Sequence, residues 1–281
     1  MIPPPADAGG LINTFYIIET GSVPIEEPVP AYSAQLMVMV RGQVRFTFAD
    51  GSVGESGSIV IKAPQMRSAR GLLEGSALQI GASLTHVAWQ RLANLPADEV
   101  HDRLIPPEAV FAPDQIAALE AAAAACRDGL IAPEAVCATL TEVVAAGSHR
   151  LRADHVAVVE AILRWLGSGF DPDLAELYGS VTVSPRQVQR ICRRFFGVAP
   201  AQVLKRFRAL RAAMLLSQTG ISEEVHDQLM ATYFDQAHLI RDIRRYTGRT
   251  PSQFRRQSLV EKLLDPAAHG DAGTPLRSAA E

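Results

Sequence analysis

Two stretches of the chain resemble each other closely: SPRQVQRICRRFFGVAPAQ at residues 184–202 and DQAHLIRDIRRYTGRTPSQ at residues 235–253. They align without a gap at an offset of 51, and six of the nineteen aligned positions are identical. The identical pairs are Arg190/Arg241, Arg193/Arg244, Arg194/Arg245, Gly197/Gly248, Pro200/Pro251 and Gln202/Gln253. This repeat predicts two copies of one structural unit.

Each copy has the pattern of an amphipathic helix, because its apolar residues recur at spacings of four and three. These residues are Val188, Cys192 and Phe195 in the first copy and Leu239, Ile243 and Tyr246 in the second. A second, polar and basic face is predicted from Gln187, Arg190 and Arg194, matched by His238, Arg241 and Arg245. Gly197 and Gly248 stand where the end of a helix favours a left-handed residue.

A shorter predicted helix precedes each copy, one introduced by Asp171 and Pro172 and the other at residues 221–230. A short helix, a turn and a longer basic helix make a helix-turn-helix, here present twice. Apolar residues in 201–216 are spaced four, three and four, which predicts one continuous helix between the copies. Such a rod would set the two units in successive major grooves, about 34 Å apart.

Three motifs in this region are more specific than its periodicity. They are S-x-R-x-x-x-R followed by G-x-x-P from Ser184, R-x-L-R-A-A at residues 208–213, and DQAHLIRDIRRYTGRTPSQFRR from Asp235. With them, about residues 155–257 resemble the AraC/XylS family of transcriptional regulators. The resemblance implies double-stranded DNA as a partner, together with RNA polymerase, a small-molecule effector and a second copy of the chain.

The resemblance also implies which side chains meet DNA. Base edges would be read by Arg186, Gln187, Gln189 and Arg190 in the first copy, and by Gln236, Ala237, His238 and Arg241 in the second. Arginine suits guanine and glutamine suits adenine, whereas alanine offers only apolar contact, such as with a thymine methyl group. Phosphates would be met by Arg193, Arg194, Arg206, Arg244 and Arg245.

Three residues ahead of the second long helix depart from the family pattern. Thr232 stands where the family commonly has glycine, and a β-branched residue resists a positive φ angle. Asp227 and Gln228 stand where the preceding helix normally carries apolar or alanine residues. These departures predict a distorted or weakened second motif.

Charge is distributed unevenly along the 281 residues, although the net charge is only −3. The balance is −8 over residues 1–149, +7 over 150–262 and −2 over 263–281. An acidic half joined to a basic half indicates that only one half meets a polyanion. We expect an effector-sensing or oligomerisation domain at 1–150, a double helix-turn-helix DNA-binding domain at 151–262 and a disordered tail at 263–281.

The predicted fold class is α+β, with a small β-rich, barrel-like or cupin-like start and an all-α carboxy-terminal domain. Strand patterns occupy residues 14–19, 35–40, 44–48, 58–62 and 77–84, with a hairpin turn at Asp50-Gly51. Pro24, Pro28 and Pro30 interrupt the early part. Helical patterns follow at residues 86–95, 113–126, 133–146 and 154–166.

Residues that would support other chemistry are missing from the sequence. Cys126, Cys137 and Cys192 form no C-x-x-C pair, and no histidine spacing suits a metal, so no disulfide framework or metal site is expected. No nucleophile–base pair is evident, and we predict no catalytic residue and no cofactor. Without an apolar run of ~20 residues or a signal-peptide pattern, we expect a cytoplasmic protein with no membrane partner.

Three classes of function stay open at this point. The leading hypothesis is a one-component transcription factor whose amino-terminal half senses a small molecule or holds a dimer. The second is an unrecognised enzyme domain fused to a DNA-binding segment, although the β-rich part lacks the paired-histidine motif of metal-binding cupins. The third is an interaction module that has a weakened second motif and acts through a protein partner. Salt-sensitive, sequence-selective DNA binding separates the first from the third.

Overall fold

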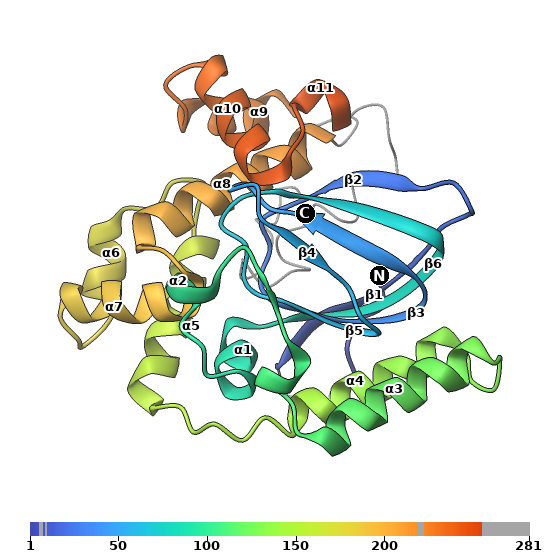
Figure 1. Cartoon of the computed structure of the whole chain (residues 1–281). Helices are drawn as coiled ribbons and strands as arrows, with labels where there is room; N and C mark the ends of the chain where they lie inside the picture. The colour runs from blue at the N-terminus through green and yellow to red at the C-terminus, as the bar shows by residue number, and fades with distance from the viewer. Residues whose placement is uncertain (6–7, 9, 218–221, 255–281) are drawn as a thin grey trace.

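The computed structural model describes residues 1–5, 8, 10–217 and 222–254. A seven-stranded antiparallel sheet forms the first part and helices form the second (Figure 1). The predicted α+β class, with a β-rich start and a helical end, is therefore confirmed. The tail predicted at 263–281 lies outside the described residues. We call residues 1–150 the β region and residues 151–254 the helical region.

The sheet is organised around two long, mutually paired strands, β3 (Gln35–Thr47) and β6 (Ala69–Leu84). Its strand order is β1-β6-β3-β5-β7, while β2 adds to β6 and β4 adds to β3. The remaining strands are β1 (Ile12–Glu19), β2 (Ile25–Val29), β4 (Val53–Glu55), β5 (Ile59–Lys62) and β7 (Leu104–Ile105).

Three features of the sheet differ from the strand patterns. The predicted strands at 35–40 and 44–48 are one strand, which passes through register shifts near Gly42. The last long strand begins at Ala69, whereas the pattern placed its start at residue 77. Pro28 lies inside β2, where it is tolerated because β2 pairs along β6 as an edge strand.

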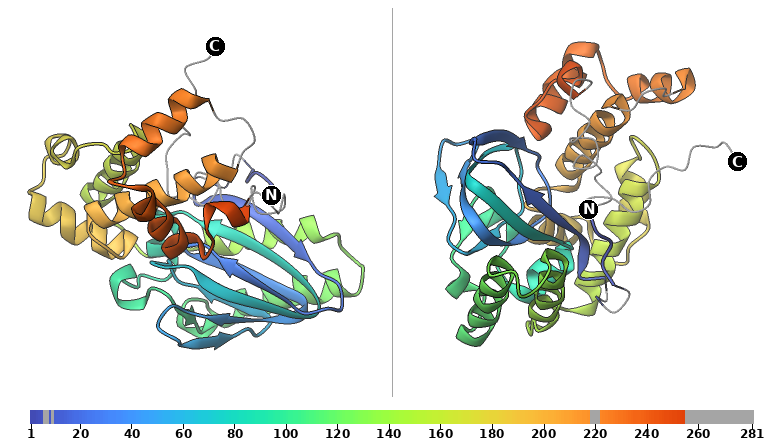
Figure 2. Two further views of the ribbon diagram at one scale, coloured as in Figure 1. Left: turned by 90° about the horizontal axis from the view of Figure 1, so that it is seen from above. Right: turned by 90° about the vertical axis from the view of Figure 1, so that its right-hand side faces the viewer.

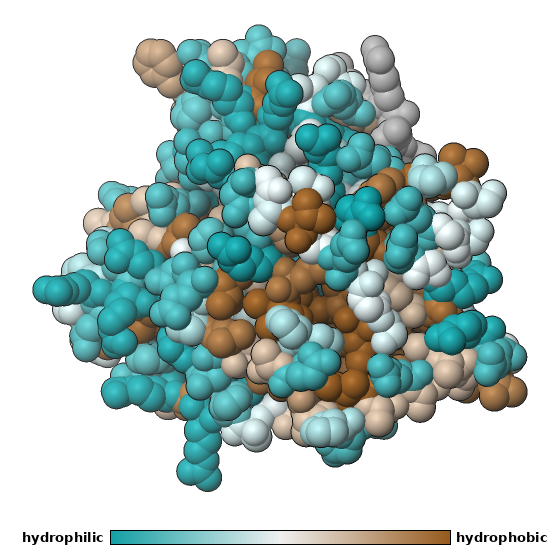
Figure 3. Space-filling model, in the orientation of Figure 1, coloured by the Kyte–Doolittle hydropathy of each residue, from teal (hydrophilic) through white to brown (hydrophobic). Residues whose placement is uncertain are grey.

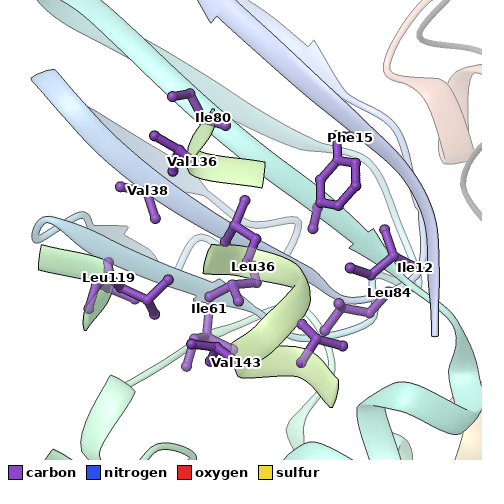
Figure 4. Packing of buried hydrophobic residues seen from close by; sticks show 14 of the residues in the cluster. Ile12, Phe15, Leu36, Val38, Ile61, Ile80, Leu84, Leu119, Val136 and Val143 are labelled. Carbon is purple, nitrogen blue, oxygen red and sulfur yellow. The ribbon is translucent and has the colours of Figure 1, made fainter. Parts of the chain in front are cut away.

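Both faces of the first part of β3, residues 35–40, are buried, which explains its continuous apolar run. Leu36 and Val38 pack toward the helical hairpin of α3 (Pro113–Arg127) and α4 (Val136–Ala145), in the core shown in Figure 4. Met37 and Met39 belong to a second cluster with Tyr16, Phe46 and other residues. A two-sided core of this kind gives the β region a rigid surface on which helices can dock.

The other helices follow the predicted order. They are α1 (His86–Leu92), α2 (Ala97–Val100), α5 (Ala153–Gly167), α6 (Leu174–Gly179), α7 (Pro185–Phe196), α8 (Pro200–Ser217), α9 (Glu223–Ala231), α10 (Gln236–Thr247) and α11 (Pro251–Phe254). The helix predicted at 133–146 is divided into a 3-10 turn, Pro133–Ala135, and α4. The short helix predicted after Asp171 and Pro172 is α6, which begins at Leu174 and is capped by Asp173, so Asp171 is not its capping residue. None of the helices described here is long and apolar enough to cross a membrane.

The long helix α8 is the predicted rod between the two helix-turn-helix units. Its first half supplies Val203 and Phe207 to a core shared with α5, α6 and α7. Its second half supplies Ala212 and Ala213 to a core shared with α9, α10 and α11. Figure 2 shows α8 running between these two groups of helices.

Candidate nucleic-acid interface

The first helix-turn-helix consists of α6 and α7. Ser184 caps α7, since its hydroxyl accepts the Gln187 backbone N–H at 3.4 Å and Gln187 Oε1 accepts the Ser184 N–H at 3.2 Å. This reciprocal pair and Pro185 in the first turn start the helix. Gly197 ends it in the left-handed conformation, with φ +84°. Gln187, a predicted base contact, therefore satisfies the backbone of its own helix.

The second helix-turn-helix consists of α9 and α10, and the turn between them is regular. Thr232 is right-handed, with φ −84°, and its hydroxyl donates to the Leu229 carbonyl at 2.7 Å. The position therefore needs no glycine. Asp227 and Gln228 lie exposed on α9. Because both helices form around a buried Leu229, the three departures do not distort the motif.

Equivalent residues of the two copies form the exposed face of each longer helix. These residues are Arg186, Arg190 and Arg193 on α7 and Ala237, Arg241 and Arg244 on α10. Each set has spacings of four and three, and the sets are related by the repeat offset of 51. Gln236 and Arg245 are exposed beside the second set. In Figure 3 the surface over α6 and α7 is largely hydrophilic.

Two predicted base contacts on these helices are engaged within the protein. Gln189 Nε2 donates to the Tyr178 hydroxyl at 3.3 Å. His238 Nε2 lies 3.2 Å from Asp242 Oδ2, and its ring packs edge-on against Tyr233. The other predicted base contacts are exposed: Arg186, Gln187, Arg190, Gln236, Ala237 and Arg241.

Two predicted phosphate contacts are also engaged within the protein, at the boundary with the β region. Arg194 Nη2 donates to Asn94 Oδ1 at 2.6 Å. Arg206 is only 1% exposed, and its Nη1 donates to the Gln65 carbonyl at 3.0 Å. In this arrangement Arg206 cannot reach a phosphate.

A buried carboxylate that the sequence reasoning missed ties α10 to α8. Asp242 is 3% exposed, and its Oδ1 lies 3.1 Å from Lys205 Nζ. The sequence repeat could have revealed this buried carboxylate, because Asp242 aligns with the apolar Ile191 of the first copy. An acid at a position that is apolar in the other copy indicates a specific buried partner.

Other arginines of α8 serve packing. Arg208 lies 4.7 Å from the centre of the Tyr233 ring and donates to Asp171 Oδ1 at 2.9 Å. Arg211 lies 4.2 Å from the centre of the Phe207 ring, and burial lowers the pKa of its guanidinium to about 10. Part of the positive charge of the helical region therefore holds its own helices together.

The β region contacts the carboxy-terminal end of α7. Gln90 Nε2, from α1, donates to the Arg194 carbonyl at 3.0 Å, and His86 Nδ1 lies 3.2 Å from the Phe195 carbonyl. These are carbonyls of the last helical turn, which lack partners within the helix.

The β region contacts α10 at the same two positions of the repeat. Ser68 N–H donates to the Arg245 carbonyl at 3.1 Å, and Ala31 N–H donates to the Tyr246 carbonyl at 2.8 Å. Arg249 adds an ion pair with Glu27. We call these two sets of contacts the docked ends of α7 and α10.

The glycines that end the two helices make this close approach feasible. A Cβ atom at Gly197 would lie 2.8 Å from Met66 Sδ, and one at Gly248 would lie 2.6 Å from Pro28 Cβ. Both glycines have positive φ angles. The docked ends thus fix both helices against the β region, while their opposite ends, with Arg186 and Gln236, begin farther from it.

Gln65 links the amine of Lys62 in the β region to the guanidinium of Arg206 in α8. Its side-chain oxygen accepts a hydrogen bond from Lys62 Nζ, and its backbone carbonyl accepts the one from Arg206. Lys62 is fully buried, with Nζ 5.6 Å from the centre of the Phe46 ring. Burial lowers the pKa of Lys62 to about 7, and the carboxylate of Asp102 offsets part of that effect.

Removing the Gln90 side chain should loosen the docked end of α7. We expect Gln90→Ala to lower the free energy of unfolding by about 1–3 kcal/mol, since a buried carbonyl loses its donor. Amide exchange in residues 86–95 and 194–198 should become faster. The exposed Gln43→Ala variant is the control, and equal exchange in both variants would contradict this account.

The comparisons with known proteins agree with the helical geometry. Residues 179–257 match the family described as "Helix-turn-helix domain", of the AraC type. This segment runs from the end of α6 beyond α11 and contains both longer helices. The resemblance inferred from the motifs is thus confirmed, and a DNA-binding domain of transcription regulators is identified. No curated protein sequence matches the chain.

Several solved structures are similar over most of the chain. ToxT from Vibrio cholerae O395, bound to (E)-4-(8-methylnaphthalen-1-yl)but-3-enoic acid, has 10% identity and a TM-score of 0.49, covering 89% of this chain and 98% of that chain. ToxT from Vibrio cholerae strain SCE256, bound to unsaturated fatty acid, has 10% identity and a TM-score of 0.44, covering 83% and 94%. The AraC-like transcriptional activator CuxR has 11% identity and a TM-score of 0.31, covering 78% and 77%.

Proposed function

We propose that this chain, whose residues 179–257 are an AraC-type helix-turn-helix domain, is a one-component transcription regulator that reads duplex DNA with α7 and α10. The main support for this proposal is the pair of equivalent exposed faces on α7 and α10. Two copies of one basic face, held on a single rod, suit two successive major grooves of one duplex.

Within this proposal each exposed residue has a role set by its place on the helix. Arg186 and Arg190 contact guanine edges from α7, and Gln236, Ala237 and Arg241 contact bases from α10. Phosphates are met by residues nearer the carboxy-terminal ends: Arg193, Arg244 and Arg245. Gln187, Gln189, His238, Arg194 and Arg206 would each have to leave an internal partner before they could contact DNA.

The docked ends support a sensing role for the β region. They hold the same two positions of both longer helices against the β region. A ligand that changes the structure of this boundary would therefore change the orientation of α7 and α10 toward DNA. Gln65, in contact with Lys62 and Arg206, offers a route from the interior of the β region to α8. We propose that a small-molecule effector acts through this boundary.

Two further partners follow from the family resemblance. We propose that the chain forms a homodimer through the β region and that the DNA-bound protein contacts RNA polymerase. Sedimentation of the purified chain should show two chains per particle, both in the free protein and, after the mass of the duplex is subtracted, in the DNA complex. One chain per particle under both conditions would contradict the proposed dimer.

The function is tested by binding of the full chain to fragments of genomic DNA over a range of salt concentrations. We expect a few fragments to bind far more tightly than the rest, with affinity falling steeply between about 50 and 200 mM salt. Equal binding to all fragments at every salt concentration would contradict the proposal. Stoichiometric zinc or iron in the purified protein would instead favour a fused enzyme.

Phosphate contacts and base contacts should respond differently to substitution. We expect Arg193→Ala and Arg244→Ala each to weaken binding to all sequences alike and to reduce the slope of log affinity against log salt by about 1. A salt titration on one selected and one unrelated duplex measures both effects. An unchanged slope would mean that these residues do not neutralise phosphates. A loss of affinity confined to the selected duplex would mean that they contact bases instead.

A further inference from the structure

The turn between α9 and α10, whose place is shown in Figure 1, carries an exposed aromatic residue, Phe234, just ahead of the proposed DNA-reading helix. Phe234 is 94% exposed, whereas its neighbour Tyr233 is buried in the core of the second motif. It is more exposed than the other large hydrophobic residues of the described chain, of which Leu130 is next at 77%.

The repeat shows that this position normally has a packing role. An apolar residue just before a helix cap commonly packs against the fourth helical residue, as a hydrophobic staple. In the first copy the equivalent of Phe234 is Val183, which is partly buried in the same cluster as Val188. In the second copy Phe234 points into solvent, while the fourth helical residue, Leu239, is buried among other side chains.

Phe234 is continuous with the exposed face of α10. Gln236, Ala237 and Arg241 follow it in exposed positions, and Phe234, Ala237 and Arg241 are spaced three and four residues apart. Arg241 and Arg244 give this face positive charge, while the carboxylate of Asp235 caps the helix amino-terminus by accepting the His238 N–H at 2.6 Å. A polyanion therefore complements the surface around the ring better than an apolar protein surface does.

We propose that Phe234 is a specificity-determining residue that contacts the C5-methyl group of a thymine next to the bases read by α10. In the major groove a thymine methyl group is the apolar feature that distinguishes one base edge from the others, and phenylalanine can pack against it. This inference rests on the proposed DNA-binding function and adds to it an apolar contact made outside the helix itself.

The test removes the methyl group from DNA and the ring from the protein in turn. A duplex selected from random sequence by the wild-type chain is prepared with each thymine replaced singly by deoxyuridine. We expect wild-type affinity to fall about fourfold at one thymine beside the α10 half-site, as for loss of one buried methyl group. Phe234→Ala should bind the thymine and deoxyuridine duplexes equally, whereas Phe234→Leu should keep part of the difference.

Two controls separate this contact from other effects. Leu130→Ala, which removes another exposed apolar side chain, should retain the full sensitivity to deoxyuridine. Arg241→Ala should bind more weakly and still distinguish the two duplexes. If Phe234→Ala and wild type respond identically to every deoxyuridine, the inference is overturned while the proposed function stands. If the wild-type chain selects no sequence, both fail together.

Discussion

Replacing Arg190 or Arg241 by alanine is expected to weaken binding to a selected duplex by about 1–3 kcal/mol, or roughly 5–150-fold. The two arginines are identical positions of the repeat, and both lie exposed at the centre of their face. A bidentate arginine–guanine pair loses two hydrogen bonds on truncation, and the loss depends on the base present. The variants should therefore also discriminate less at one base pair in each half-site.

Fluorescence anisotropy with wild type, each variant and Arg45→Ala measures this effect. Arg45 is a suitable control because it lies on β3, paired with Glu55 at 2.9 Å, and carries the same charge. A loss with Arg190→Ala alone would mean that the second motif forms without reading bases. No loss with either variant would favour the interaction module, in which DNA is not the main partner.

Replacing Lys62 by methionine is expected to stabilise the protein at pH 7 by about 2–4 kcal/mol. The unfolded lysine has a pKa of 10.5, whereas burial lowers the folded pKa to about 7. Between these values the unfolded chain binds more protons, so wild-type stability rises as the pH rises. Each pKa unit corresponds to about 1.4 kcal/mol, and the hydrogen bond lost by Gln65 offsets part of the gain.

Urea unfolding of wild type and Lys62→Met at pH 7 and about pH 9.5 tests this expectation. The difference in unfolding free energy between the two proteins should shrink at the higher pH, because wild type then loses less by burying the amine. Arg45→Met controls for the removal of a charge. A difference that stays constant with pH would show that Lys62 folds in its charged form.

Local chemistry was sufficient to predict the helices that carry the proposed interface. Ser184 and Pro185 start α7, Gly197 and Gly248 end the two longer helices, and the repeat offset pairs their faces. The signals were short-range, since caps, turns and periodicity act within a few residues. The internal partners of Gln189 and His238 were not evident from these local signals.

The contacts between the β region and the helical region could not be predicted, because they join residues far apart in the sequence. Arg206 looks like any basic residue on a helix, and only its contact with Gln65, 141 residues away, shows that it is buried. In the same way, Pro28 is compatible with a strand only because β2 lies at the edge of β6. Contacts of this kind follow from tertiary packing, which overrides local patterns.

Methylation interference on a duplex selected by the full chain distinguishes reading by both helices from reading by one. Two equivalent reading helices on one rod predict two groups of guanines whose N7 methylation blocks binding, about 10 base pairs apart on one side of the duplex. Arg190→Ala should abolish interference at one group and Arg241→Ala at the other. A single group of guanines, or two groups that both respond to the same variant, would contradict two-site reading.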